Sequence, residues 1–548
     1  MVVSATTRVG AGPCWWVPGP EPPVTGEAAL QDQLLRLGEP CALVERDGQL
    51  AVALGGQIAL GGTPATPWLP LRGHVTALHP SQLGDPGFCQ AHGVRYAYVA
   101  GAMANGIASE ELVEAMAREG LLAIFGAAGL APDRVEAAIH RLQGSLGDRP
   151  FGFNLIHSPN ETGLEDALVD LYLRHGVRRV CASAFLALTL PLLRYRLHGI
   201  HRDPNGHVVT PNQVLGKVSR AEVARKFLSP APEAMLRKLV EQGHLTDEQA
   251  RLAEEVPVAE DLTAEADSGG HTDNRPLVTL LPSMVTLRDE LQERYRYARP
   301  IRIGAAGGVA TPASAAGAFA MGASYVLTGS INQGCVEAGT SATVKEMLAQ
   351  ASQSDINMAP AADMFEMGVR VQVLKWGTMF AVKARKLYEL YRANESLETL
   401  PAAERATLER DYFRRSVEEE WHSTRRFFEQ RDPRQVARAD QDPKHRMALV
   451  FRSYLGQSSR WANAGEPSRK VDYQIWCGPA MGAFNEWARG TFLEQLSERR
   501  VAVLAHNLMF GAAYLTRLHW LQSQGVHLPA AVRAFRPMKV EDLLQRLS

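Results

Sequence analysis

Cysteine is scarce in this sequence: there are six in 548 residues, and no two of them form a CxxC pair. Cysteines this far apart argue against a structural zinc site and against a disulfide framework, so a reducing cytoplasm is the expected location and no metal is expected. An excess of charge is also missing, because Lys+Arg 58 nearly balances Asp+Glu 59. The chain is therefore not expected to bind nucleic acid or an anionic membrane surface.

Export and membrane signals are not found either. The first residues, MVVSATTRVGAGPCWW, lack a basic segment followed by an apolar run, so no secretory signal is expected. The longest charge-free stretch, residues 303–336, is broken by seven glycines and Pro312. A membrane span needs about 20 mainly apolar residues, so this stretch is interpreted as buried loop and strand. The remaining composition, 46% hydrophobic and 21% charged, is that of a globular protein.

Three regions are expected from the pattern along the chain. Residues 1–85 are rich in proline and glycine, and Arg46-Asp47-Gly48 separates two short apolar runs, which predicts a small β-rich cap. Residues 86–345 alternate short apolar runs, turns and helical segments. Residues 346–548 are dominated by amphipathic helical patterns and are expected to form a C-terminal helical region.

The middle region predicts an α/β fold. Eight candidate strands are followed by helical segments, which favours a closed (β/α)8 TIM barrel, although periodicity alone leaves a doubly wound open sheet possible. The expected strands are 95–100, 121–125, 151–155, 179–182, 214–218, 256–259, 301–305 and 324–328.

Two departures from a minimal barrel are expected. Asp203-Pro204-Asn205-Gly206 is a turn signal within 197–209 and predicts an additional hairpin. Residues 221–255 are too long for one helix, since Pro232 opens a helix, Gly243 ends it, and Thr246 with Gln249 forms a capping box for the next. We expect this helical insertion to lie over the mouth of the barrel.

Glycine-bearing turns follow the last two expected strands. Gly307 and Gly308 precede a helix that Thr311-Pro312 opens, and Gly329-Ser330 ends the next strand. In barrels, backbone N–H groups of these two turns usually hold a phosphate. Tight turns that bind no ligand are the alternative interpretation.

A polar segment, Glu265 to Asn274, lies just beyond the expected end of the sixth strand. The paired glycines Gly269 and Gly270 allow close approach of a flat or anionic group, and His271 beside them is suited to proton transfer near neutral pH. A lone histidine is more often structural. Its place at the C-terminal end of a barrel strand, where barrel enzymes have their active sites, favours function.

Further candidates follow other strands. Ala102 and Met103 could admit a planar ring, the amide of Asn154 could bind its edge, and Lys217 could stabilise an anion that develops on it. Each could equally be a core or turn residue. Cys335 invites comparison with a catalytic cysteine, but the sequence assigns it no base.

Several segments together resemble the PfaD family, trans-acting enoyl reductases of polyunsaturated fatty acid synthases and of polyketide synthases with separate acyltransferases. That family belongs to the flavin-dependent barrels that include nitronate monooxygenases. Two of the matching segments, DINMAPAADMFEMG (355–368) and DYQIWCGPAMGAFN (472–485), lie outside the barrel and are the most diagnostic. The matching segments are GAMANGIAS (101–109), FGFNLIHSP (151–159), KVSR (217–220), EADSGGHTDNRP (265–276), GAAGGVATP (304–312), TGSINQGCVEAGTS (328–341), DINMAPAADMFEMG (355–368) and DYQIWCGPAMGAFN (472–485).

The resemblance implies FMN on the C-terminal face of the barrel. Its phosphate would lie at Gly307, Gly308, Gly329 and Ser330. His271 matches the histidine that these barrels place beside the flavin, and with Lys217 it forms the expected catalytic pair. The residues expected around the flavin ring are Ala102, Met103, Asn154, Lys217, Gly269 and Gly270.

The resemblance also implies a reaction. NADPH would reduce FMN, and the hydride would pass to the β-carbon of a 2-enoyl thioester on an acyl carrier protein, with His271 as hydrogen-bond donor or proton source and Lys217 favouring the anionic reduced flavin. From their position in the chain, the 221–255 insertion and the C-terminal helical region are expected to recognise the carrier and to shield the reduced flavin from oxygen. A homodimer is left possible.

Two alternatives stay open. A nitronate monooxygenase-type oxidase would use the same flavin barrel with oxygen and would not need NADPH. A non-catalytic docking component of a synthase would keep the fold but not the chemistry, although the glycine turns and His271 argue against it.

Overall fold

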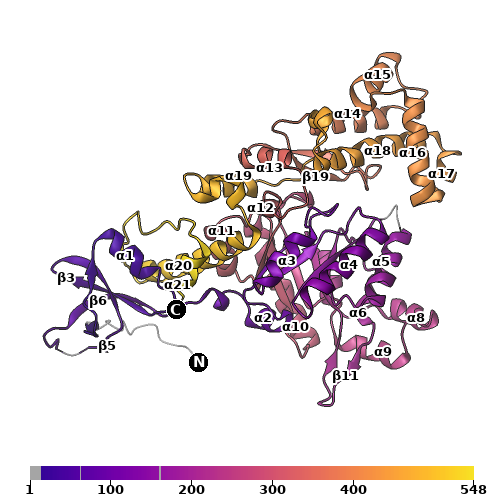
Figure 1. Cartoon of the computed structure of the whole chain (residues 1–548). Helices are drawn as coiled ribbons and strands as arrows, with labels where there is room; N and C mark the ends of the chain where they lie inside the picture. The colour runs from indigo at the N-terminus through magenta and orange to yellow at the C-terminus, as the bar shows by residue number, and fades with distance from the viewer. Residues whose placement is uncertain (1–13, 62, 159–161, 548) are drawn as a thin grey trace, which may run out of the picture. The chain divides into compact units, whose positions relative to one another are not determined.

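The computed structural model describes residues 14–61, 63–158 and 162–547 (Figure 1). They form two compact units: one holds the residues up to 83 with 312–317 and 503–548, and the other holds 84–311 and 318–502. This division differs from the three expected regions, because residues 503–548 join the N-terminal unit. Residues 1–13, where the lack of a secretory signal was expected, and Pro159 of the FGFNLIHSP segment lie outside the described residues.

The larger unit contains a closed barrel of eight strands, in which every neighbouring pair is parallel. Pairing of the last strand with the first closes the barrel and excludes the open sheet. The expected α/β TIM-barrel fold is therefore confirmed. The strands are β7 (Tyr98–Ala100), β8 (Leu122–Phe125), β9 (Gly152–Ile156), β10 (Arg179–Ser183), β13 (Gln213–Val218), β14 (Asp261–Glu265), β16 (Arg302–Ala306) and β17 (Tyr325–Thr328).

Helices follow the strands and form the outer layer, as βα alternation requires. Some of them begin with a side-chain N-cap, for example Ser109, whose hydroxyl accepts a hydrogen bond from Leu112 N–H. These helices are α3 (Glu110–Arg118), α4 (Pro132–Leu146), α5 (Thr162–Arg174), α6 (Leu190–Leu197), α7 (Ala221–Leu228), α10 (Leu277–Tyr295), α11 (Pro312–Ala320), α12 (Ser330–Gln333) and α13 (Ala342–Ala349). Helix α2 (Pro86–His92) precedes the first strand, and its Phe88 packs in the barrel core against Tyr325.

The sixth barrel strand, β14, begins later than expected. The apolar run 256–259 lies in the connection before it, so the prediction of a strand there is wrong. The true strand has buried polar side chains at every second position, which disguised it as a loop. Asp261 pairs with Arg302 at 2.6 Å, Thr263 bonds the hydroxyl of Tyr325 at 2.8 Å, and Glu265 pairs with Lys217. Glu265 is thus the last residue of a barrel strand.

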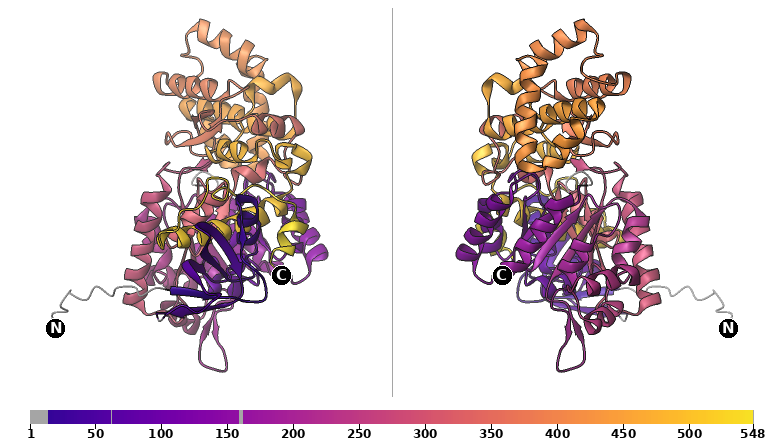
Figure 2. Two further views of the ribbon diagram at one scale, coloured as in Figure 1. Left: turned by 90° about the vertical axis from the view of Figure 1, so that its left-hand side faces the viewer. Right: turned by 90° about the vertical axis from the view of Figure 1, so that its right-hand side faces the viewer.

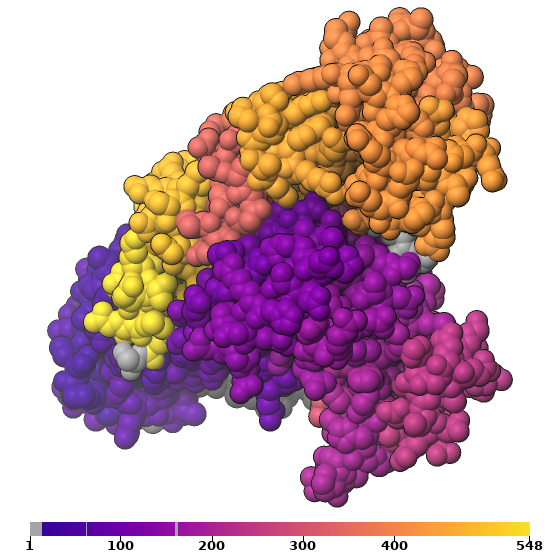
Figure 3. All heavy atoms as spheres, turned by 45° about the vertical axis from the view of Figure 1, so that its right-hand side comes forward, coloured from indigo at the N-terminus to yellow at the C-terminus, as the bar shows by residue number. Residues whose placement is uncertain are grey.

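The insertion after β13 does not cover the barrel mouth. It contains the expected helices α8 (Glu233–Glu241) and α9 (Asp247–Leu252), with the capping box of Thr246 and Gln249. Figures 2 and 3 show α8, α9 and the expected hairpin of β11 (His201–Arg202) and β12 (Val208–Val209) at the end of the barrel opposite to helices α14–α18. The chain leaves the mouth along α7 and uses the additional helices on its return to β14.

The mouth is covered instead by residues that follow the barrel. Strand β15 (Gly270–His271) pairs with β19 (Arg370–Leu374), which pairs with β18 (Ile356–Pro360). A helical region with its own apolar core follows. It comprises α14 (Phe380–Ala393), α15 (Ala402–Thr407), a π-helical turn (Leu408–Phe413), α16 (Val417–Arg431), α17 (Pro433–Ala439), α18 (Pro443–Ala464) and α19 (Ala480–Ala488).

The smaller unit combines the N-terminal sheet with α20 (Val501–Ser523) and α21 (Val540–Gln545). Helix α20 is long and apolar enough to cross a membrane. However, 78% of its most apolar 18-residue stretch is buried in the structure, as in a core helix. The buried guanidinium of Arg517 donates to the backbone oxygens of Arg36 and Glu39 just beyond α1 (Glu27–Leu34). The sheet has the order β2 (Val24–Thr25), β4 (Gln49–Leu54), β3 (Cys41–Arg46), β6 (Leu69–Val75), β1 (Cys14–Val17) and β5 (Gln57–Leu60).

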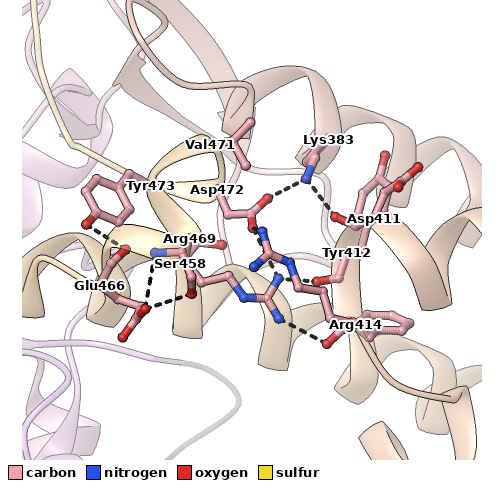
Figure 4. A network of polar contacts seen from close by, with 12 residues as sticks. Lys383, Asp411, Tyr412, Arg414, Ser458, Glu466, Arg469, Val471, Asp472 and Tyr473 are labelled. Carbon is pink, nitrogen blue, oxygen red and sulfur yellow. Dashed lines mark hydrogen bonds and ion pairs between the residues drawn. The ribbon is translucent and has the colours of Figure 1, made fainter.

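A buried carboxylate holds the helical region together (Figure 4). Asp472 is fully buried and accepts hydrogen bonds from Lys383 Nζ at 2.5 Å, Tyr454 Oη at 2.8 Å and Arg469 Nη1 at 3.1 Å. Arg469 also donates to the backbone oxygen of Tyr412 at 2.6 Å. Asp472 thus joins α14 and α18 to the segment that runs on to Tyr473, and Arg469 joins the same segment to the π-helical turn.

Replacing Asp472 with alanine should lower the free energy of unfolding by about 3–5 kcal/mol, because Lys383 and Arg469 lose a buried counter-ion. Chemical denaturation followed by circular dichroism measures this. Asp440→Ala is the matched control, since Asp440 pairs with Arg425 at the surface with 47% of its side chain exposed, and such pairs contribute about 0–1 kcal/mol. Equal losses in the two variants would contradict the buried network.

Candidate active site

A large cavity opens at the C-terminal ends of the barrel strands. It encloses about 1170 Å³ of empty space, counted out to its mouth, and its lining is mainly apolar with a few polar groups, as is common for cofactor sites. Every residue predicted from the sequence to bind a cofactor or act in catalysis lines this one cavity. These residues are Ala102, Met103, Asn154, Lys217, Gly269, Gly270, His271, Gly307, Gly308, Gly329 and Ser330.

The two glycine turns fit a bound phosphate group. Gly307 has φ +85°, and a Cβ there would lie 2.6 Å from the carbonyl carbon of Ala266, so only glycine fits. A Cβ on Gly308 or Gly329 would meet nothing within 4 Å and would point into open space. The turns are therefore not closed by the protein's own side chains, which is what a cradle for an anion requires.

The side of the cavity formed by β9 and β10 has a fixed amide. Asn154 Nδ2 donates to the backbone oxygen of Cys181 at 3.0 Å and to Ser183 Oγ at 2.8 Å. Both donor positions of this amide are thus used, and a ligand contact falls to Oδ1. Ser183 itself lines the cavity, although the sequence analysis did not single it out.

Lys217, at the end of β13, has a partner on the neighbouring strand. Its Nζ lies 2.5 Å from Glu265 Oε1, because Lys217 and Glu265 end adjacent parallel strands. Burial lowers the pKa of Lys217, but the negative charge of Glu265 and its hydrogen bond with the lysine raise that pKa, so the net pKa lies above its usual value. The lysine is therefore held as a cation whose charge is balanced by Glu265.

His271 is held by a carboxylate from outside the barrel. Its Nε2 lies 2.9 Å from Asp363 Oδ1, and the two side chains are 25% and 30% exposed. Burial lowers the pKa of His271, but Asp363 and then Glu265 raise it more, so the net pKa is above the ordinary value. Among the described residues, no hydrogen bond involves Nδ1 of this ring, so Nδ1 can serve a substrate atom.

The segment before His271 is packed against the chain that follows the helical region. A Cβ on Gly269 would lie 2.9 Å from the backbone nitrogen of Cys477, so this close approach requires glycine. The adjoining Trp476 and Ala480 line the cavity. Gly478 N–H donates to Ser330 Oγ at 3.1 Å, which ties this segment to the predicted phosphate turn.

The loop that carries Asp363 is anchored in the helical region. Phe365 is fully buried in the core of that region, and Arg452 of α18 donates to the backbone oxygen of Ala362 at 3.0 Å and pairs with Glu366 at 3.2 Å. The backbone hydrogen bond from Ala361 N–H to Val369 O closes the loop. We call His271 and Asp363 the dyad, and we name residues 361–369, which carry Asp363, the dyad loop.

Besides Ser183, sequence reasoning did not identify Glu265, Asp363 and Trp476 as parts of the site. Each of these last three lies in a segment quoted for the family resemblance, so the segment itself was the available signal. No local pattern could pair Asp363 with His271, since the two are 92 positions apart.

Cys335, which invited comparison with a catalytic cysteine, does not line the cavity. It is fully buried, and burial raises its pKa well above the usual value, so it is not a thiolate.

Comparison with known proteins agrees with this geometry. The family model "Nitronate monooxygenase" matches residues 88–387, more than half of the chain. A second model, the inserted helical domain of acyl-carrier-protein S-malonyltransferase, matches residues 394–473, within the helical region.

Two of the curated relatives are named for polyunsaturated fatty acid or polyketide biosynthesis. The chain is 47% identical over 461 residues to a subunit of the polyunsaturated fatty acid synthase of Thraustochytrium, covering 82% of the chain and 31% of the relative. It is 47% identical over 434 residues to "Polyketide biosynthesis protein PksE" of Bacillus subtilis, covering 79% and 56%. The chain thus spans between about a third and somewhat more than half of these relatives.

A solved structure also matches most of the chain. It is the enoyl reductase domain of MlnA from the macrolactin biosynthesis cluster of Bacillus amyloliquefaciens, with a TM-score of 0.77 and 41% identity. The match covers 80% of this chain and 99% of that domain. With the barrel and its cavity, these findings show that the chain belongs to the PfaD-type trans-acting enoyl reductases, within the nitronate monooxygenase-like barrels.

Proposed function

We propose that this protein is an FMN-dependent enoyl reductase that consumes NADPH and reduces the 2,3 double bond of enoyl thioesters on an acyl carrier protein. The observation that carries the proposal is that His271, which is paired with Asp363, lines the same cavity as the open glycine turns. Membership of the enoyl reductase family and the synthase relatives support an oxidoreductase in polyketide or polyunsaturated fatty acid biosynthesis.

The cavity fits FMN. Gly307, Gly308, Gly329 and Ser330 would hold its phosphate, and Ala102, Met103, Asn154, Lys217, Gly269 and Gly270 would surround its ring. When bound, FMN supplies the hydride chemistry that amino acid side chains lack.

His271 would stabilise negative charge on the thioester or supply a proton to it. Asp363 accepts a hydrogen bond from Nε2–H and keeps the ring protonated and oriented. Nδ1–H can then donate to the thioester oxygen where negative charge develops, or deliver a proton to the α-carbon. The Lys217–Glu265 pair adds a fixed cation within the same wall of the cavity.

The carrier would bind on the side of the helical region. The 221–255 insertion, expected to share this role, lies at the far end of the barrel (Figure 3), so carrier recognition is assigned to the helical region alone. The match of residues 394–473 to a helical domain of an acyl-carrier-protein transferase supports this. Cytoplasmic location remains part of the proposal.

Absorbance spectroscopy tests the proposed function. The purified protein with FMN should show a flavin spectrum that bleaches on anaerobic addition of NADPH and returns when a crotonyl thioester on a carrier protein is added. NADPH oxidation that does not depend on the thioester would contradict the proposal. Oxygen-dependent turnover of a small nitronate without NADPH would favour the monooxygenase alternative.

Replacing Asp363 with asparagine should move the alkaline limb of the kcat/KM profile to lower pH. The wild-type pKa of His271 is raised, so the protonated ring persists above the usual histidine range. Without the carboxylate, the effect of burial remains and lowers that pKa. Steady-state rates across pH 5–10 measure the shift. An unchanged limb would show that His271 does not act as the acid.

A further inference from the structure

A second cavity adjoins the first on the far side of His271. It lies at the ends of β10, β13 and β14, three successive barrel strands, and encloses about 640 Å³ of empty space, counted out to its mouth. The two cavities share four lining residues: Ala184, Lys217, Glu265 and His271. A ligand in the second cavity would therefore lie against the same histidine as a ligand in the first.

The walls of the second cavity away from the shared residues are largely apolar. Phe185 and Val218 come from strand ends, Val223 comes from α7, and Met364 and Val369 come from the dyad loop. Phe185, Val218, Val223 and Met364 are each at most 4% exposed, so these walls are firmly packed.

The polar groups on the other side of this cavity are already bonded to one another. Arg220 donates to both carboxylate oxygens of Asp273 at 2.8 and 2.9 Å, and Ser219 Oγ donates to the same carboxylate at 2.8 Å. Because these groups already hydrogen-bond to one another, they leave few donors and acceptors for a polar ligand. The cavity therefore suits an apolar ligand.

Backbone strain marks the place where the cavities meet. Ala184 lines both of them and has φ +63°, a left-handed conformation that disfavours residues with a Cβ. Such strain persists where the surrounding structure holds it, and it gathers at ligand sites.

We infer that the second cavity receives the apolar acyl chain of the thioester beyond its double bond, and that Val223 and Met364 set the chain length it accepts. The inference rests on the proposed function, since it places the reacting carbons at His271 and the rest of the chain past it. A small nitronate would not need this space, and a pantetheine arm, rich in amides, would leave its polar groups unpaired there.

The contribution of chain length follows from burial of methylene groups. Each CH₂ that enters an apolar cavity strengthens binding by about fourfold. The affinity for saturated N-acetylcysteamine thioesters should therefore rise from butanoyl to octanoyl in the FMN-loaded protein, and kcat/KM for the matching 2-enoyl thioesters should rise with it.

Two substitutions test the walls from opposite sides. Val223→Trp fills the cavity and should lower the octanoyl-to-butanoyl affinity ratio at least about tenfold, whereas Met364→Ala lengthens the cavity and should move the optimum to longer chains. Val278→Trp on α10 is the matched control, because Val278 is 67% exposed and lines neither cavity. The flavin spectrum and circular dichroism report folding.

The readouts separate this inference from the proposed function. Calorimetric binding of saturated thioesters does not depend on reduction. A lowered octanoyl-to-butanoyl affinity ratio in Val223→Trp therefore supports the acyl-chain site even if no enoyl thioester is reduced. In that case only the proposed function fails. If reduction proceeds but the octanoyl-to-butanoyl ratios match those of the control in both variants, the acyl-chain assignment is overturned and the proposed function stands.

Discussion

Replacing His271 with alanine should lower the turnover of enoyl thioesters by about 10²–10⁴-fold, the usual contribution of a general acid, and leave FMN bound. The expectation follows from the pair with Asp363, which holds Nε2 and leaves Nδ1 for the substrate. The loss should fall on kcat more than on KM, since the hydrogen bond strengthens as charge develops on the thioester oxygen.

Stopped-flow measurement locates this loss. Flavin reduction by NADPH should stay near the wild-type rate in His271→Ala, whereas reoxidation by the enoyl thioester should slow. His244→Ala is the matched control, because His244 is exposed and lies between α8 and α9 at the far end of the barrel. Wild-type reoxidation in His271→Ala would remove this residue from the reaction.

Replacing Gly329 with valine should weaken FMN binding by at least about 100-fold and abolish turnover. A Cβ at this position meets nothing within 4 Å, so the added side chain would clash with no neighbour and would occupy the space assigned to the phosphate. Loss of several charge-assisted hydrogen bonds from backbone N–H groups accounts for the size of the effect.

The control for this substitution is Gly144→Val on α4. A Cβ there also meets nothing within 4 Å, and Gly144 lies outside both cavities. FMN titration followed by fluorescence quenching compares the two variants at unchanged circular dichroism. Equal FMN affinity in Gly329→Val and wild type would place the phosphate elsewhere. Gly307 is unsuited to this test, because its substitution would clash with the backbone of Ala266.

The barrel could be predicted from the sequence because most of its strands are apolar and separated by regular helices. The sixth strand could not, since Asp261, Thr263 and Glu265 interrupt its apolar pattern with side chains whose partners lie on other elements. The same limit applies to α20, whose apolar surface is the core partner of an N-terminal sheet hundreds of positions earlier.

Some residues of the candidate site could be predicted from the sequence, and others could not. Gly307, Gly308 and His271 were predictable, because strand ends and glycine turns are local features that a barrel brings to one rim. Asp363 and Trp476 were not, because β15–β19 pairing and the helical core bring them there. The position of the 221–255 insertion was predicted wrongly, since a segment length does not say which end of a barrel the chain visits.

The dyad loop has a consequence for protein engineering. A shortened chain that ends with the barrel at residue 345 would keep the glycine turns and His271 but lose Asp363, Met364 and Trp476. Such a minimal scaffold could still take up flavin, yet its histidine would have no carboxylate and its second cavity no outer wall. Chimeras that exchange substrate preference between family members should therefore transplant the barrel and the helical region as one module.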